Sequence, residues 1–175
     1  MIQVNCDLLK QPGVIVQQCN CVTVKAHGLS QIIKIKYPYA DIYSQRSKQS
    51  PNYATLSTRG IPGTCVISHS EDPEKPIVAS LMGQISPGKP GTWAKVYNID
   101  PKIDSAQARL EYFRLALEEL LLICTESNES KFKTVSFPYR IRCGLAGGDW
   151  SKYHKFLEDF ATRATGVQVY LCRIE

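Results

Sequence analysis

The nine residues Arg-Cys-Gly-Leu-Ala-Gly-Gly-Asp-Trp at positions 142–150 decide how the rest of the chain is interpreted. They follow an apolar run at residues 134–138 that is typical of a buried strand, and they lead into an amphipathic segment that begins near Trp150. The glycines permit positive φ angles and bring backbone N–H groups close to a ligand. Because the next helix would add free N–H donors and the positive end of its dipole, the stretch predicts a site for an anion. The alternative is an ordinary corner between a strand and a helix.

The length and composition of the chain indicate one folded domain. Its 175 residues are enough for one well-buried core and few for two, and a hydrophobic content of 43% is ordinary for a folded soluble protein. No apolar run approaches the roughly 20 residues that span a bilayer, and the first residues lack the pattern of a secretory signal. We therefore expect residues 1–175 to form a single monomeric domain in the cytosol or nucleus, not secreted and without a membrane partner.

Charge and cysteine content narrow the possible partners. A net charge of +5 favours anionic partners, without choosing among a nucleotide, a nucleic acid and a modified protein. The seven cysteines are odd in number and mostly lie in apolar surroundings, which predicts reduced, buried thiols. Cys19 and Cys21 have no matching Cys or His pair at zinc-site spacing. The sequence therefore predicts no metal site and no cofactor.

Hydrophobic periodicity predicts strands that alternate with helices. The expected strands are residues 2–6, 14–19, 64–68, 77–82, 134–138 and 167–171. The expected helices are residues 30–37 capped by Ser30, one or two helical turns within residues 39–48, residues 105–124 capped by Asp104 or Ser105, and residues 150–166. This order is typical of an α/β sandwich, in which the β-branched second strand is buried on both faces.

Three loops follow the second, fourth and fifth expected strands. They are residues 20–29, residues 83–102 with glycines near their start, and residues 139–149. Ligands in open α/β sheets bind beyond the carboxyl ends of the strands. Because all three loops should meet at one rim, we expect a single cleft for an extended ligand that carries phosphate.

Short motifs in a fixed order resemble the macro domain family over essentially the whole chain. They are Asp7-Leu8 after the first strand, Gln18-Cys19-Asn20-Cys21, Ala26-His27-Gly28-Leu29, Lys36-Tyr37-Pro38, and the run at residues 138–150. The chain is most similar to the branch that contains the terminal ADP-ribose protein glycohydrolases and the yeast ADP-ribose-1''-phosphate phosphatase. The resemblance implies a three-layer α/β/α fold with a mixed six-stranded central sheet and ADP-ribose along one rim.

The resemblance also implies a role for each matching residue. Asp7 would bind the adenine amino group, Asn20 would hold the distal ribose, and backbone amides at residues 144–148 would surround the pyrophosphate. Carboxylate, amide and backbone N–H groups are chemically suited to these partners. The implied ligand-binding residues are Asp7, Leu8, Asn20, Lys25, His27, Gly28, Leu29, Gln84, Cys143, Gly144, Leu145, Ala146, Gly147, Gly148 and Asp149.

The family's catalytic residues do not match this sequence. The nucleophilic lysine of the glycohydrolase branch falls at Gly83 or Gln84, and the catalytic aspartate of that branch falls at Ala146. In the branch with a glycine-rich loop, the catalytic aspartate falls near Ser30. The remaining candidates for catalysis are Asn20, His27 and Asp149.

Each candidate also has a simpler interpretation. Asn20 can only orient the sugar, because an amide has no accessible basic pKa. Asp149 stands where a helix N-cap belongs, and His27 in a loop can be merely solvated. Trp93 and Tyr97 can cover adenine or ribose, or can anchor the long second loop.

Taken with the resemblance, these observations predict an ADP-ribose-binding domain that acts as a hydrolase. It would remove ADP-ribose from a terminal linkage or dephosphorylate ADP-ribose-1''-phosphate. The missing lysine and aspartates favour the alternative, a reader module that binds ADP-ribosylated protein or nucleic acid without turnover. A plain nucleic-acid binder is less well supported, because the lysines and arginines are scattered and form no stripe interleaved with aromatic residues. Nucleic acid is therefore expected only as a modified substrate.

Overall fold

The strands form one mixed six-stranded sheet with the order β1-β6-β5-β2-β4-β3. The computed structural model describes residues 1–141, 143 and 146–174. The strands are β1 (Ile2–Asn5), β2 (Val14–Asn20), β3 (Cys65–Ser68), β4 (Ile77–Gln84), β5 (Thr134–Pro138) and β6 (Gln168–Arg173). Neighbouring strands are parallel except β3 and β4, which pair antiparallel as a hairpin. The mixed sheet implied by the resemblance is confirmed, and β2 lies between β5 and β4.

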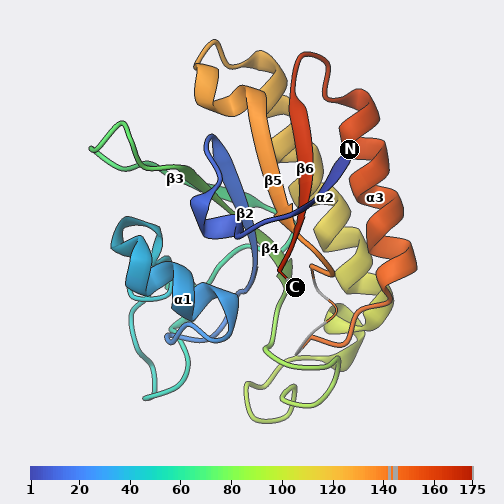
Figure 1. Cartoon of the computed structure of the whole chain (residues 1–175). Helices are drawn as coiled ribbons and strands as arrows, with labels where there is room; N and C mark the ends of the chain where they lie inside the picture. The colour runs from blue at the N-terminus through green and yellow to red at the C-terminus, as the bar shows by residue number, and fades with distance from the viewer. Residues whose placement is uncertain (142, 144–145, 175) are drawn as a thin grey trace.

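Helices on both faces of the sheet produce three layers. The α-helices are α1 (Leu29–Lys36), α2 (Ala106–Glu126) and α3 (Trp150–Arg163). Short 3₁₀ helices are η1 (Leu8–Lys10), η2 (Pro38–Ala40), η3 (Leu56–Thr58), η4 (Pro101–Asp104) and η5 (Ser130–Lys133). Figure 1 shows α2 and α3 on one side of the sheet and α1 on the other. The expected α/β/α architecture is therefore confirmed. Among the described residues, no helix has both the length and the apolar character needed to cross a bilayer.

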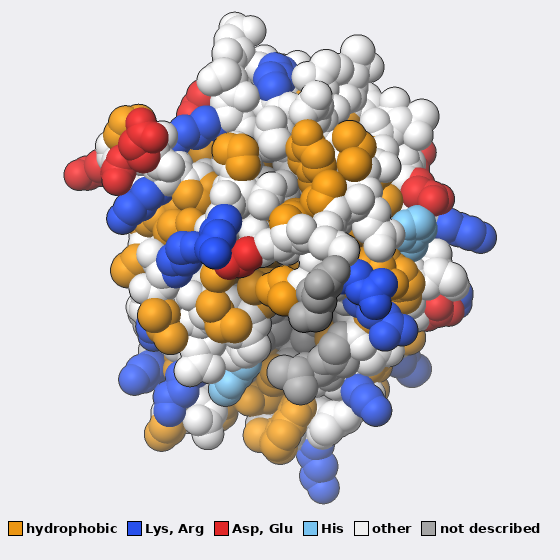
Figure 2. Space-filling view, viewed as in Figure 1, with side chains coloured by type: hydrophobic (Ala, Val, Ile, Leu, Met, Phe, Trp, Pro, Cys, Tyr) orange, Lys and Arg blue, Asp and Glu red, His pale blue; other side chains and the backbone are white. Residues whose placement is uncertain are grey.

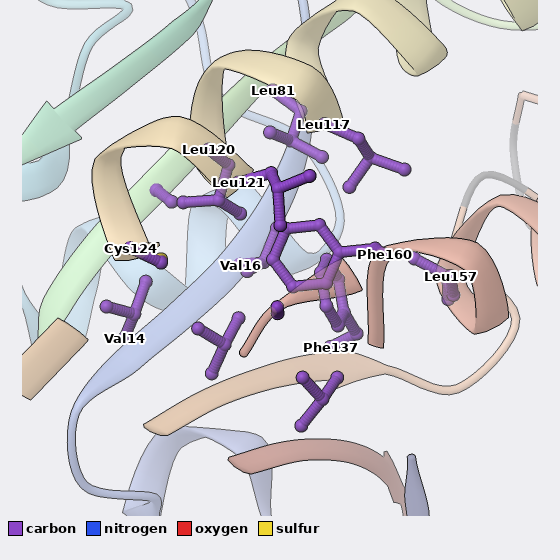
Figure 3. Packing of buried hydrophobic residues seen from close by; sticks show 14 of the residues in the cluster. Val14, Val16, Leu81, Leu117, Leu120, Leu121, Cys124, Phe137, Leu157 and Phe160 are labelled. Carbon is purple, nitrogen blue, oxygen red and sulfur yellow. The ribbon is translucent and has the colours of Figure 1, made fainter. Parts of the chain in front are cut away.

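The central strand β2 is buried on both faces because its residues alternate between two cores. Val14 and Val16 pack with Leu117 in the core between the sheet and helices α2 and α3, as Figure 3 shows. Ile15, which lies between them in sequence, packs with Ile33 of α1 in a separate core on the other face. Burial on both faces holds the carboxyl end of β2 firmly in the middle of the sheet.

The start of α1 differs from the prediction. The helix begins at Leu29 with Gly28 as its N-cap, and no side chain caps it. Ser30, the predicted cap, lies two residues past the cap position and is the second residue of the helix. It is buried inside the helix, with its Oγ 3.8 Å from the Sγ of Cys19. A cap must precede the first helical residue, so Ser30 packs against β2 instead.

The helical turns predicted within residues 39–48 form only as the short η2. After η2, the Asp41 side chain accepts a hydrogen bond from the backbone N–H of Ser44 at 3.3 Å, and the Ser44 hydroxyl donates to the Asp41 carbonyl at 3.1 Å. Such local bonds compete with a helix for the same backbone groups. The following residues Tyr43 and Arg46 turn inward and are buried.

The cysteines are all free thiols. Four are buried, as predicted, namely Cys19, Cys21, Cys124 and Cys172, whereas Cys6, Cys65 and Cys143 are only half-buried. Burial raises the pKa of the Cys21 thiol to about 12, so this side chain packs as a neutral group. Within the described part of the chain, no three metal-ligating side chains gather in one place.

Candidate functional site

A cleft of about 930 Å³ opens where β2, β4 and β5 end. Residues from all three loops that follow these strands line it, so the predicted convergence of the loops on one rim is confirmed. In Figure 1 these strands end at the lower edge of the sheet, above the loops that form the lower part of the molecule. The lining residues are Gln18, Asn20, Thr23, Lys25, His27, Gly28, Leu29, Ser30, Tyr43, Asn52, Tyr53, Gln84, Pro87, Gly88, Trp93, Val96, Tyr97, Pro138, Tyr139, Arg140, Ile141 and Ala146.

Asn20, the last residue of β2, is held from several sides. Its backbone N–H donates to the hydroxyl oxygen of Tyr43 at 3.0 Å. Its side-chain Oδ1 accepts from the N–H of Val22 at 3.1 Å and from the N–H and hydroxyl of Thr23 at 2.9 and 3.1 Å. These bonds fix the orientation of the Asn20 carboxamide. Nδ2 has no partner among the described residues, so Asn20 can offer a ligand a donor, whereas its acceptor is already used.

A buried ion pair that the sequence analysis missed holds the loop after β4. Asp104, at the end of η4, accepts from the backbone N–H groups of Ile85 at 2.9 Å and Ser86 at 3.0 Å. Arg109 of α2 donates to Asp104 from Nε at 2.9 Å and from Nη2 at 2.8 Å. Arg109 also donates to the carbonyls of Ser86 at 3.1 Å and Gly88 at 2.7 Å. The pair therefore fixes residues 85–88 against α2, and with them one wall of the cleft.

The charge state of Asp104 follows from these contacts. Burial pushes the pKa of the Asp104 carboxyl upward, but hydrogen bonds from Arg109 and Ser86 outweigh burial and hold that pKa below its ordinary value. The carboxylate is therefore ionised at neutral pH and balances the charge of Arg109. The sequence contained one local signal of this ion pair. Arg109 stands four positions before Phe113, so this charged residue lies on the apolar face of its helix.

Gln18 and Gln84 form the floor between β2 and β4. Gln18 Nε2 donates to Gln84 Oε1 at 3.3 Å, and Gln84 Nε2 donates to the carbonyl of Ser86 at 2.9 Å. A side chain at Gly83 would place its Cβ 2.4 Å from the Gln18 amide, so Gly83 makes room for this pair. The positions at which the resemblance places a nucleophilic lysine thus hold a glycine and a neutral amide, and neither is a nucleophile.

Trp93 gives the second loop an open aromatic surface. Its indole ring rests on Gly88, where a Cβ would lie 3.1 Å from Nε1, and the side chain remains 44% exposed at the edge of the cleft. Tyr97 is buried and meets the Tyr53 ring edge-on at 5.6 Å. Of the two roles considered for these aromatics, anchoring the loop fits Tyr97, whereas Trp93 has surface free for a ligand.

The second and third loops touch each other through a lysine and a glycine. Gly147 has a φ of +67°, and the aliphatic stem of Lys89 lies over it, so that a Cβ there would stand 3.0 Å from the Lys89 Cγ. This contact places the charged end of Lys89 near the rim that the third loop forms.

Comparison with solved structures identifies the fold. The macrodomain of Mycobacterium tuberculosis DarG aligns with a TM-score of 0.70 and 18% identity, over 99% of this chain and 97% of that chain. This chain has the macrodomain fold. The macrodomain of Thermus aquaticus DarG aligns with a TM-score of 0.66 and 16% identity, over 98% of this chain and 97% of that one. Thermosipho africanus DarTG in complex with ADP-ribose aligns at 0.60 with 15% identity, over 99% of this chain and 42% of that one. No protein-family model and no curated protein matches the sequence.

Several residues predicted to bind a ligand do line the cleft. They are Asn20, Lys25, His27, Gly28, Leu29, Gln84 and Ala146. Lys25 and His27 are exposed on the loop between β2 and α1, where a ligand can reach them. What each residue does to a ligand stays a prediction.

Other predicted residues lie off the cleft lining. Asp7 caps η1, because its Oδ1 accepts from the backbone N–H of Leu9 at 2.9 Å, and Leu8 is buried. The remaining residues that do not border the cleft are Cys143, Gly147, Gly148 and Asp149. Gly144 and Leu145, which the resemblance assigns to the pyrophosphate, lie outside the described residues.

Asp149 is the N-cap of α3, one of the two roles considered for it. Its Oδ1 accepts from the hydroxyl of Ser151 at 2.8 Å and from the backbone N–H of Ser151 at 3.0 Å. These two bonds hold the pKa of Asp149 below its ordinary value. The cap therefore occupies the N–H of Ser151, which is one of the donors that this helix start was expected to offer an anion.

The ionisable side chains in the cleft lining are basic or phenolic. Lys25, His27 and Arg140 border the cleft, and no Asp or Glu belongs to its described lining. Such a surface suits an anionic ligand. Elsewhere, Figure 2 shows lysine and arginine side chains scattered over the face it presents rather than gathered in one stripe.

Proposed function

We propose that the cleft binds ADP-ribose, alone or attached to a macromolecule. The observation that carries this proposal is a large cleft at the carboxyl ends of parallel strands, lined by Lys25, His27 and Arg140 and by no carboxylate among the described residues. A pyrophosphate is attracted to such a site, and an exposed indole, Trp93, gives a planar surface beside it. The likeness to a DarTG structure in complex with ADP-ribose supports the same ligand.

The polar groups at the two ends of the rim fit the two ends of this ligand. Asn20 holds the distal ribose through Nδ2, because only that atom of its carboxamide is without a partner in the described chain. Asp7 reads the adenine amino group through Oδ2, since Oδ1 already accepts from Leu9. Asp7 follows β1, beyond the described cleft lining, and Asn20 ends β2, with β6 and β5 between these strands, so the ligand extends along the rim from the cleft toward Asp7.

We further propose that the macrodomain is a hydrolase that releases ADP-ribose from a terminal linkage or removes the 1''-phosphate. In the first reaction a water oxygen bonds to the anomeric carbon, the attached group leaves with the electron pair of the bond that breaks, and the water proton passes to His27, which can return it to the leaving group. An imidazole can exchange a proton near neutral pH. Asp149 is the weaker candidate for this step, because it caps α3 and does not border the cleft. Asn20 orients the sugar.

A reader module that binds without turnover is the second candidate. It is favoured by the lack of any carboxylate in the described lining and by the neutral Gln84 where the resemblance places a lysine. Binding requires only the surface described above, whereas turnover requires His27 or the substrate's own phosphate to move a proton.

One experiment tests binding and turnover in sequence. Calorimetry and thermal melting with free ADP-ribose should show one site and a raised melting temperature, because a ligand of the native state stabilises it. No heat and no shift at millimolar ligand would refute ADP-ribose binding. Mono-ADP-ribosylated protein, ADP-ribosylated nucleic acid and ADP-ribose-1''-phosphate are then each incubated with wild type and with His27→Ala. Release by wild type and loss in the variant support the hydrolase, whereas binding with every linkage intact supports the reader.

A further inference from the structure

Arg46 is a buried cation whose contacts lie directly beneath the cleft. It comes from the irregular segment after η2, and its guanidinium donates from Nη2 to the carbonyl of Asn20 at 2.7 Å and from Nη1 to the carbonyl of Thr23 at 2.8 Å. Both residues line the cleft. The guanidinium also stacks on the ring of Tyr43 at 4.6 Å, and Tyr43 in turn accepts from the N–H of Asn20.

The guanidinium has no ion-pair partner in the part of the chain that the structure describes. Among the described residues, no carboxylate lies within ion-pair distance of Arg46. Burying a charge is unfavourable unless it is well hydrogen-bonded. Here the partners are carbonyl oxygens at the first and last positions of the turn at residues 20–23, so the charge of Arg46 is satisfied only when this turn has its observed shape.

The surroundings leave the guanidinium little freedom to move. A Cβ at Gly60 would lie 3.1 Å from Nη2 of Arg46 and 2.9 Å from the Sδ of Met82. The N–H of Gly60 donates to the carbonyl of Cys21, inside the same turn, at 2.9 Å. The backbone at Gly60 therefore closes over the guanidinium, and the turn, Arg46 and Gly60 form one packed unit.

The turn and the Asn20 side chain depend on each other. With the carbonyls of Asn20 and Thr23 directed at Arg46, the N–H groups of Val22 and Thr23 are directed at Asn20 Oδ1. That arrangement uses the acceptor of the carboxamide and leaves Nδ2 for a ligand. The N–H groups of Val22 and Thr23 belong to the two peptide units between these carbonyls, so a change in the backbone angles of the turn that releases the carbonyls would also move the N–H groups.

We propose that Arg46 is a positioning residue that sets the orientation of the Asn20 amide and so determines how strongly the cleft prefers ADP-ribose over ADP. This inference rests on the proposed function, because it assumes that ADP-ribose occupies the cleft with its distal ribose at Asn20. Arg46 does not line the cleft and touches no ligand itself. ADP lacks the distal ribose, so its affinity should be indifferent to the Asn20 amide.

The test is the ratio of two dissociation constants, those of ADP and ADP-ribose, measured by calorimetry. Arg46→Met keeps the packed stem and removes the charge and the fork of donors, and Arg46→Lys keeps the charge but cannot reach both carbonyls as a planar fork. The preference for ADP-ribose should fall about tenfold in Arg46→Met and by an intermediate factor in Arg46→Lys, the scale of one misdirected hydrogen bond to a ligand. Affinity for ADP should stay constant.

A matched control separates orientation from general loss of stability. Val169→Ala removes a buried side chain near the start of β6, at the opposite end of the sheet from the cleft, and should lower the melting temperature while leaving the ratio unchanged. An unchanged ratio in folded Arg46→Met would overturn the proposal, and if that variant does not fold, an unchanged ratio in Arg46→Lys would do so. Failure of the wild type to bind ADP-ribose would instead refute the proposed function.

Discussion

Two buried arginines each hold one loop of the cleft, and they do so with different partners. Arg109 fixes the loop after β4 together with the carboxylate of Asp104, so the unit is a neutral ion pair. Arg46 fixes the turn after β2 through the carbonyl oxygens of Asn20 and Thr23, and its other hydrogen-bond partner in the described chain is the neutral Sδ of Met82 at 3.8 Å. The charges of Arg109 and Asp104 balance each other, whereas the contacts of Arg46 leave a positive charge beneath the part of the rim where Asn20 lies.

The two arginines differ in what their removal leaves behind in the fold. Removing one member of a buried ion pair strands the other charge, whereas removing a cation that is bound only to carbonyls strands neutral groups. The Asp104 pair should therefore dominate stability, and the Arg46 turn should dominate ligand preference. The predictions below test this division.

Arg109→Met should have the largest effect on folding. The variant leaves the Asp104 carboxylate buried without its cation, and it should lower the free energy of unfolding by about 3–5 kcal/mol. Urea denaturation measures the loss. Arg114→Met is the matched control, because Arg114 is an exposed partner of Glu111 on the same helix and its removal should leave stability nearly unchanged. Equal losses in the two variants would contradict the ranking.

Arg46→Met should lower the free energy of unfolding by a smaller amount, about 1–3 kcal/mol, because it leaves two carbonyls unpaired rather than a charge. The same urea titration measures it. A loss as large as that of Arg109→Met would mean that Arg46 has an anionic partner, and the comparison between the two loops would fail.

Asn20→Ala should weaken ADP-ribose binding about tenfold, since one hydrogen-bond donor to the ligand is lost. If the protein turns over, the rate should fall further than the affinity, because misplacing the sugar by about 1 Å can lower a rate by about 10²-fold. Calorimetry and product release give the two numbers. Equal affinity for ADP-ribose in the variant and the wild type would remove Asn20 from the binding surface.

Acid should destabilise the loop that Asp104 holds, but not the turn that Arg46 holds. The pKa of Asp104 is lowered in the folded protein, so its contribution to stability is complete above its unfolded pKa of about 3.9 and is lost as the pH falls through the lower folded value. Melting curves between about pH 5 and pH 2 should show this loss in the wild type and in Arg46→Met. Arg109→Met removes a bond that lowers the pKa, so its curve should be flatter. Equal slopes in all three would contradict the assignment.

Asp149→Asn should have the smallest effect. Asparagine caps a helix about as well as aspartate, so the melting temperature should not change. Lost turnover at an unchanged melting temperature would make Asp149 catalytic, in place of His27. Unchanged turnover would leave it as the cap that its bonds to Ser151 describe.

The parts that could be predicted from sequence are those set by neighbouring residues. Alternation of apolar residues marked the strands, Ser105 proved to be the cap of α2, and Asp149 proved to cap α3. The three loops followed from the strand order. The spacing of apolar residues indicates which face of a helix or strand is buried, because each kind of element repeats the same geometry along the sequence.

The residues that escaped prediction act across long stretches of chain. Arg46 lies in a segment that was predicted to hold helical turns but is irregular after η2, and its partners Asn20 and Thr23 are more than twenty positions away. Asp104 stands at a helix start, where a carboxylate can serve as a cap as easily as an ion-pair partner. Tyr43 gave no signal either, since its hydroxyl contacts Asn20, which lies more than twenty positions earlier in the chain.

The contact between Lys89 and Gly147 has a consequence for anyone who transplants loops between proteins of this fold. The side chain of one loop rests on the bare backbone of the other, so each loop is shaped to its neighbour. Replacing residues 143–149 with a segment that has a side chain at position 147 would displace Lys89 and, with it, the segment that Arg109 holds at Gly88. A graft that exchanges both loops together should fold better than either exchange alone.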